Sequence, residues 1–292
     1  MEFDDFLGAA WADHATDTPG VAERLQTAGA VLAAQAPQVA ALAHLAHHVL
    51  GEHLGRWQEG IALQRELAAL PAARGDAGVA QAAGRYIASL SLAGGMADLR
   101  ADLGDSDRIR VTAMAAASLV ERDTARARVL FQQALADAET AGLPGTDPCT
   151  RALAVTGNNL AATLEEKAAR TADERDLMIL AAQAARRCWA LAGTWLETER
   201  AEYRLAMSWL QAGDPARARH HAGQCLEIVQ ANDGPALERF FAWEAIGVAA
   251  RAAGDSGNHQ QALAQAREAF QALDEADRVG CKGSLDKLAA AP

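Results

Sequence analysis

Residues 205–225 read LAMSWLQAGDPARARHHAGQC, and this stretch decides the fold. It begins with a leucine followed by a small residue, Leu205-Ala206, on an apolar stretch that ends at Gly213-Asp214. Small residues then recur at Ala218, Ala222 and Cys225. Gly ends helices and Asp caps the next one, so the stretch predicts two helices joined by a tight turn.

The same spacing recurs along the chain, which indicates internal repeats. One copy lies toward the C-terminus: Ile246-Gly247, Ala250, Gly254-Asp255, Ala262, Ala266 and Ala269. Two copies lie toward the N-terminus: Leu160-Ala161, Leu164, Ala181, Ala185 and Cys188, then Met114-Ala115, Ser118, Ala127, Phe131 and Ala134. An earlier copy has Gly55, Gly60, Leu67 and Leu70-Pro71. The repeating unit spans about 40–46 residues, in the range of helical repeats.

Composition supports an all-α protein. Alanine, the best helix former, occupies 73 of 292 positions, while aromatic residues make up only 5%. Stretches rich in Val, Ile and Thr between turns, which would indicate strands, are missing. Caps and breakers predict a helix opening at Thr18-Pro19 and further helices over residues 37–54, 56–70, 77–93, 96–103, 107–121, 123–141, 149–168, 173–192, 195–212, 215–231, 235–253 and 259–278.

Three regions are predicted along the chain. Residues 1–106 form irregular helical hairpins with degenerate repeats, 107–279 hold the regular repeats, and 280–292 form a short C-terminal tail or cap. The loop-like stretch 142–148 is interpreted as a local break within one continuous stack.

The repeats resemble the tetratricopeptide repeat family, whose signature is a leucine and a small residue on the first helix, a Gly-Asp turn, and small residues on the second helix. The long unit resembles the lengthened repeats of kinesin light chains and bacterial sensor solenoids. Asn158-Asn159-Leu160-Ala161 is similar to the Asn-Asn-Leu-Ala of kinesin light chain units. The resemblance implies an all-α, right-handed superhelical solenoid of antiparallel helix pairs.

This resemblance also implies a binding scaffold for a protein or peptide, with neither enzymatic activity nor a cofactor. In the proteins it resembles, the second asparagine faces the concave groove and hydrogen-bonds the backbone of an extended peptide, which assigns that role to Asn159. The alternative for Asn159 is a hydrogen bond to a neighbouring helix. The predicted peptide-binding residues are Asn158, Asn159, Tyr203, Arg204, Met207, Glu244 and Val248.

Two other functions stay open. A regulatory sensor solenoid would close around a small ligand or peptide and alter another protein. A metal-dependent hydrolase is the third hypothesis, because His44 and His48 are spaced to share one helix face and chelate an ion. The His48-x3-Glu52-His53 spacing has one residue too many for an inverted zinc-protease motif, and packed histidines are the other reading.

The net charge, the N-terminal residues and the cysteines limit the partners and the location that we expect. The net charge of −11, with no cluster of basic residues, argues against nucleic acid and anionic membranes as partners. The start, Met1 to Phe6, is acidic and differs from a signal peptide, so we expect a cytoplasmic location. A bacterial protein is what the resemblance to bacterial sensor solenoids implies. The four cysteines are spread out without a CxxC pair, which favours free thiols. Self-association as a homodimer stays open, since the end of a solenoid is apolar unless capped.

Overall fold

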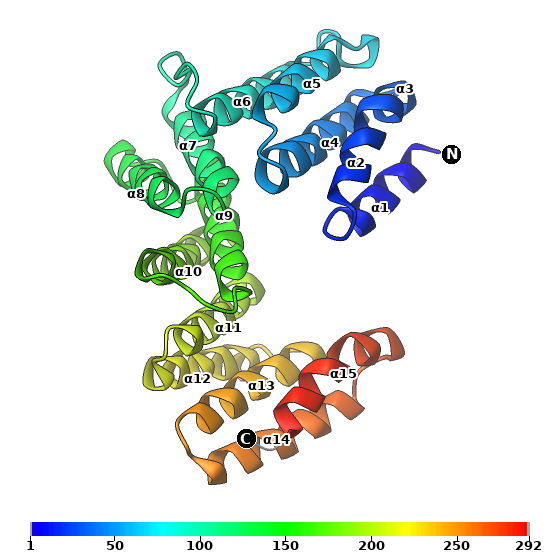
Figure 1. The fold of residues 1–292 in the computed structure, drawn as a ribbon. Helices are drawn as coiled ribbons and strands as arrows, with labels where there is room; N and C mark the ends of the chain where they lie inside the picture. The colour runs from blue at the N-terminus through cyan, green and yellow to red at the C-terminus, as the bar shows by residue number, and fades with distance from the viewer. Residues whose placement is uncertain (1, 291–292) are drawn as a thin grey trace. The chain divides into compact units, whose positions relative to one another are not determined.

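The computed structural model describes residues 2–290, which form helices joined by turns and bends with no strand among them (Figure 1). The predicted all-α class is therefore confirmed, and most helices contact mainly their neighbours in the sequence, as in a helical solenoid. The chain divides into two compact units between Leu143 and Pro144. This division falls inside the predicted 142–148 loop. None of the described helices combines the length and apolar character that a membrane span needs.

The first unit begins with a helix that caps and breakers did not indicate, α1 at Phe3–Asp13. Its other elements are α2 (Thr18–Arg24), η1 (Leu25–Gly29), α3 (Ala30–Leu32), α4 (Ala36–Ala46), η2 (His47–His53), α5 (Trp57–Ala69), η3 (Pro71–Ala73), α6 (Ala77–Ala93), α7 (Asp105–Leu119) and α8 (Thr124–Ala141). The segments η1 and η2 are π-helical and continue α2 and α4, respectively.

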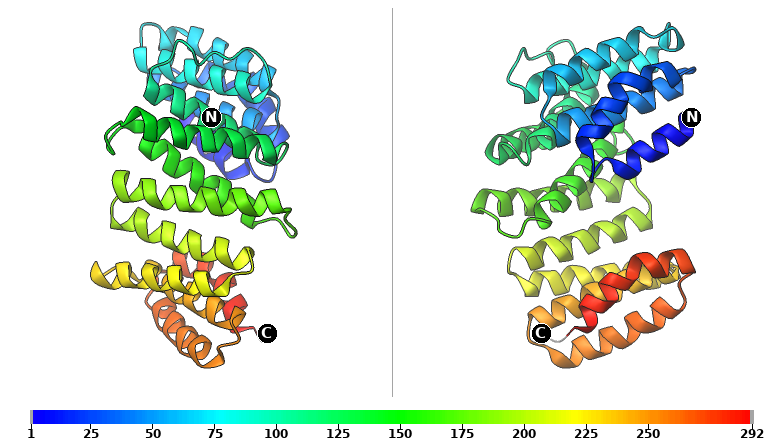
Figure 2. Two further views of the ribbon diagram at one scale, coloured as in Figure 1. Left: turned by 90° about the vertical axis from the view of Figure 1, so that its left-hand side faces the viewer. Right: turned by 45° about the vertical axis from the view of Figure 1, so that its right-hand side comes forward.

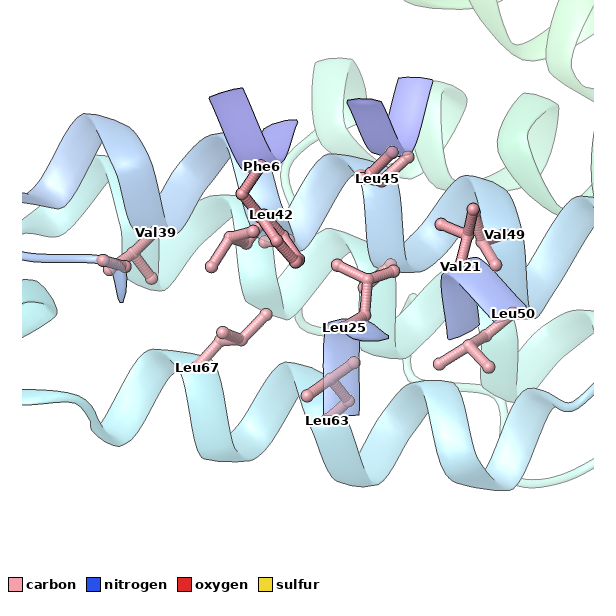
Figure 3. Packing of buried hydrophobic residues seen from close by; sticks show 14 of the residues in the cluster. Phe6, Val21, Leu25, Val39, Leu42, Leu45, Val49, Leu50, Leu63 and Leu67 are labelled. Atoms are coloured by element: carbon pink, nitrogen blue, oxygen red, sulfur yellow. The ribbon is translucent and has the colours of Figure 1, made fainter. Parts of the chain in front are cut away.

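The core of the first unit is built from apolar side chains, most of them aliphatic (Figure 3). Helix α4 contributes Leu42 and Leu45 to this cluster. Phe6 of α1, Leu25 of η1 and Leu67 of α5 belong to the same cluster. These side chains are essentially inaccessible to solvent, and burial of such groups provides the main driving force for packing. The first helices of the chain are therefore held against α4 and α5 by a hydrophobic core within the first unit.

The helix predicted over 96–103 is wrong. Gly95 has a positive φ of 67°, in the left-handed region that ends α6. Just beyond it, the carboxylate of Asp98 accepts hydrogen bonds from both the backbone N–H and the guanidinium of Arg100. Such local side-chain bonds compete with helical backbone bonds, so residues 96–100 are irregular and a turn follows at 101–102.

The second unit contains three helix pairs and a final helix: α9 (Pro148–Glu165), α10 (Ala172–Ala192), α11 (Trp195–Gln211), α12 (Pro215–Ala231), α13 (Ala236–Ala252), α14 (Ser256–Gln271) and α15 (Glu275–Ala289). Within each pair the two helices lie side by side, and α11 also contacts α9 and α13 (Figure 1). Side chains of Asp147, Thr171, Thr194, Asp214 and Asp255 cap the five helices from α9 to α12 and α14.

Most of the small residues that mark the repeats in the sequence are buried. Ala206, Ala218, Ala222 and Cys225 of the 205–225 stretch are fully inaccessible to solvent. Equivalent small residues of the other copies are buried as well: Ala161, Ala181 and Ala185; Ala250, Ala262 and Ala266; Ala115, Ala127 and Ala134. Cys188, the counterpart of Cys225, is only partly buried. The recurring small residues therefore lie where neighbouring helices meet, as their spacing predicted.

The C-terminal end differs from the prediction. The helix expected to reach residue 278 ends at Gln271, and the expected short tail is the helix α15. Asp274 caps α15 by accepting a hydrogen bond from the Asp277 backbone N–H at 2.9 Å. Cys281 and Leu288 are buried, and α15 lies against α13 and α14 (Figure 2). A capping Asp four residues beyond Phe270 was the missed signal.

Two glycines of the second unit give a matched test of this packing. A Cβ on Gly157 of α9 would lie 2.6 Å from the carbonyl oxygen of Ala181 in α10, whereas a Cβ on Gly223 of α12 would meet nothing within 4 Å. We predict that Gly157→Ala lowers the free energy of unfolding by about 1–3 kcal/mol through overpacking. Gly223→Ala should raise it by up to about 1 kcal/mol, because Ala favours helix. Urea denaturation measures both, and a shift of the same sign in the two variants contradicts the close approach of α9 and α10.

Candidate functional site

A pocket of about 280 Å³ lies in the second unit, on the first helices of the three pairs. It is lined from α9, α11 and α13 by Asn158, Glu199, Arg200, Tyr203, Arg204, Leu237, Glu238 and Phe241. Tyr203 and Phe241 meet edge to face, with ring centroids 5.6 Å apart. The pocket therefore combines an apolar wall with several charged and amide groups.

Helix α11 positions most of these groups. Thr194 and Glu197 form a reciprocal capping box that fixes its start. Residues three and four apart share a helix face, so Arg200, Tyr203 and Arg204 point the same way. This spacing places one side of α11 over α9 and α13.

Polar contacts from α11 link it to both neighbours. Arg204 forms an ion pair with Glu165 of α9. The Tyr203 hydroxyl donates a hydrogen bond of 2.8 Å to Glu244 of α13. Three consecutive pairs are thus joined by long polar side chains.

Two further buried glutamates, Glu238 of α13 and Glu202 of α11, each have partners of their own. Arg200 binds the buried Glu238 at 2.6 Å. Burial would raise the pKa of Glu202, but hydrogen bonds from His221 and Arg186 outweigh it and hold that pKa below its ordinary value. Both carboxylates therefore have cationic or hydrogen-bonding partners.

The exception is Glu199, which is only 1% exposed. One carboxylate oxygen, Oε1, accepts a hydrogen bond from the Cys225 thiol at 2.9 Å, while the buried Oε2 has no hydrogen-bond partner among the described residues. Burial raises the pKa of Glu199 to about 7; the thiol opposes this shift and the charge of Glu238 adds to it. An unpaired buried oxygen is costly, so this group is poised to accept a donor from a ligand in the pocket.

The adjacent thiol is a poor nucleophile. Burial raises the pKa of Cys225 far above its ordinary value, and the charge of Glu199 raises it further. The thiolate is the reactive form of cysteine, so this environment keeps Cys225 inert.

Of the predicted binding residues, Asn158, Tyr203 and Arg204 line the pocket. Asn159, to which the peptide-binding role was assigned, is exposed and does not line it. Successive helix positions differ by about 100°, so the two asparagines face different directions. The amide of Asn158 has no hydrogen-bond partner among the described residues, which leaves both its donor and its acceptor available.

The other predicted residues have packing roles. Met207 packs against the cluster of Ala206, Ala222 and Ala245. Val248 packs against the cluster around Phe240. Glu244 is buried beneath Tyr203, and burial raises its pKa.

Sequence reasoning missed the acidic and apolar part of the pocket. Glu199 and Arg200 precede Tyr203 and Arg204 by four residues each, so the helical period could have placed them on the same face. Leu237 and Phe241 have the same spacing on α13. No periodicity shows which of the charged residues on that face lacks a partner.

His44 and His48, the two histidines that the sequence predicts on one helix face, have different surroundings. His48 lies in a group with His14 and His53, whose ligand atoms are all within 4.8 Å of one another, and His44 is outside this group. His44 instead neighbours Trp11 and Tyr86, and burial lowers its pKa.

Comparison with known proteins assigns no family to this chain. No protein-family model matches it, and no curated protein matches it significantly. The tetratricopeptide resemblance therefore rests only on the spacing of the small repeat residues and on the burial of most of them.

The environment of Glu199 predicts a pH dependence of stability. Its pKa is about 7 in the folded protein against an ordinary value of 4.5, so between these values the folded state binds more protons than the unfolded state. The free energy of unfolding contributed by this group therefore falls as pH rises from about 4.5 to about 7, and is constant above that. Urea denaturation between pH 5 and 8 should show a shallower decline for Glu199→Gln than for wild type.

The matched control is Glu227→Gln, at an exposed position of the adjacent helix α12. This variant should keep the wild-type slope. Equal slopes for wild type and Glu199→Gln would show that the carboxyl is not protonated in the folded protein.

Proposed function

We propose that the chain is a solenoid of tetratricopeptide type that binds an extended segment of a partner protein along α9, α11 and α13. The buried small residues of four repeat copies and the pairwise packing of the helices support this architecture. In such a stack the first helices of successive pairs form one continuous surface. The pocket lies on these three helices.

The observation that carries the proposal is the unpaired Oε2 of Glu199 inside a partly apolar pocket. A ligand group that donates a hydrogen bond there removes the cost of a buried oxygen without a partner. A positively charged donor gains most, because it also stabilises the carboxylate form. Asn158 offers an amide, which pairs with both the N–H and the C=O of a peptide backbone.

The walls of the pocket define the side chain that fits. Leu237, Tyr203 and Phe241 supply an apolar surface beside the acid. Lysine carries an ammonium group on a flexible apolar stem, and aromatic faces attract cations. Arg200 and Arg204 do not repel it strongly, since their charges are paired with Glu238 and Glu165. The proposed partner segment therefore presents a lysine to this pocket.

A regulatory sensor for a small ligand is the second candidate, favoured by the volume of the pocket. At about 280 Å³ it is close to the lower end of the range for small-molecule sites. A free amine that binds the pocket and changes the radius of gyration in solution scattering would support the sensor. An unchanged radius with tight peptide binding supports the scaffold.

The test of peptide binding is selection from a displayed random 12-residue peptide library on the purified full chain. We expect selected peptides to contain lysine, and Lys→Ala in such a peptide should weaken binding at least tenfold. Phe241→Ala and Asn158→Ala in the protein should each weaken binding at least tenfold, as buried anchors do.

Asn159→Ala is the matched control, since it removes the same amide one position away and outside the pocket. It should leave the dissociation constant within about twofold, a change of less than 1 kcal/mol. Peptides that bind all three variants like wild type would overturn the assignment of this surface. Thermal melts of each variant establish that the loss concerns binding and not folding.

A further inference from the structure

Five of the eight histidines lie in the first unit: His14, His44, His47, His48 and His53. His47 is a core residue, because it is buried, contacts Ser89 at 3.2 Å, and has its pKa lowered to about 4 by burial. His14, His48 and His53 are half-buried, and one ring nitrogen from each lies within 4.8 Å of the others. These three rings therefore converge at a place that solvent ions can reach.

The π-helical segment η2 creates this convergence. The Leu54 backbone N–H donates to the Val49 carbonyl five residues earlier, at 3.0 Å. Residues five apart are offset by about 140° on an α-helix, but a π turn brings them close together. The Nε2 atoms of His48 and His53 are 3.0 Å apart as a result. π-helical turns are rare and frequently lie at functional sites.

Hydrogen bonds on the opposite ring nitrogens orient two of the rings. Nδ1 of His48 contacts the Glu52 carboxylate at 2.5 Å, and Nδ1 of His14 contacts the Trp11 carbonyl oxygen at 2.5 Å. A carboxylate and a carbonyl oxygen only accept, so each Nδ1 carries a proton, and in the neutral rings of His14 and His48 each Nε2 then has a lone pair that can face a metal ion. Metal-binding histidines are held in this way by carboxylates and backbone carbonyls.

The surroundings fix the segment that carries His48 and His53. Arg122, which follows α7, donates to the carbonyl oxygens of Glu52 at 2.8 Å and His53 at 2.5 Å. Gly55 has a positive φ of 63°, and a Cβ there would lie 2.3 Å from the Arg122 Nε. The chain thus turns sharply beneath Arg122, which holds the end of η2 in place.

We propose that His14, His48 and His53 form a zinc site, with Nε2 of each ring as ligand, Glu52 as the positioning residue for His48, and a fourth coordination position open. Zinc is bound by neutral imidazoles at about 2.0–2.1 Å, which places two ligand nitrogens of a tetrahedral site about 3.3 Å apart. The His48–His53 separation of 3.0 Å is already close to this value, and the ligand atom of His14 lies within 4.8 Å of both.

The test is isothermal titration of zinc chloride into the full chain after removal of metal by EDTA. Wild type should bind one zinc ion per chain, and its melting temperature should rise when zinc is added. His14→Gln and His53→Gln should each weaken binding at least tenfold. Glu52→Gln retains all three imidazoles and should weaken binding 10- to 100-fold, the effect of losing an orienting partner.

His44→Gln is the matched control, because His44 lies one turn before His48 and also contacts Trp11 but is outside the group of three. It should bind zinc like wild type. The proposal is overturned if wild type binds no zinc, if His44→Gln weakens binding as much as His53→Gln, or if magnesium at the same concentration competes equally. Melts without metal show that each variant is folded, and Glu52→Gln supplies an independent readout if a histidine variant is not.

Discussion

The close approach of neighbouring helix backbones is the constraint on which the second unit depends. Gly157 of α9 has no room for a Cβ against the Ala181 carbonyl, and Ala206 and Ala222 are fully buried where α11 meets its neighbours. Interfaces made of such small side chains contain few rotatable bonds, so little side-chain entropy is lost when they form. The pairs can therefore pack tightly although aromatic residues are scarce.

A second consequence concerns the contacts between pairs. The first helices α9, α11 and α13 are linked by long polar side chains, with Arg204 on Glu165 and Tyr203 on Glu244. Burying such groups costs free energy unless each has a partner, and nearly all of them do. Glu199 is the acid whose second oxygen is left unpaired, so the stacking of pairs and the binding capacity of the pocket arise from the same row of residues.

The sequence predicts the regular part of the fold well, because caps and small-residue spacing are local signals. Helices α6 and α11 to α13 lie within about two residues of their predicted ranges, the usual uncertainty at helix ends. The irregular segment over 96–103 could not be predicted from periodicity, since it depends on one side chain, Asp98, bonding to Arg100. Similarly, helical spacing predicts that Tyr203 and Arg204 share one face of α11. It cannot predict that an oxygen of Glu199 lacks a hydrogen-bond partner, because that depends on how three helices pack together.

Both candidate sites lie where the local rules fail. Folded chains satisfy propensity, capping and polar pairing almost everywhere, and departures persist where they serve function or are held by surrounding structure. In the second unit the departure is a buried acid without a full set of partners. In the first it is η2, where an α-helical reading separates His48 from His53 and the π turn brings them together. Arg122 bonds to the carbonyls at the end of this turn, so the departure is held by side-chain contacts from a distant part of the same unit.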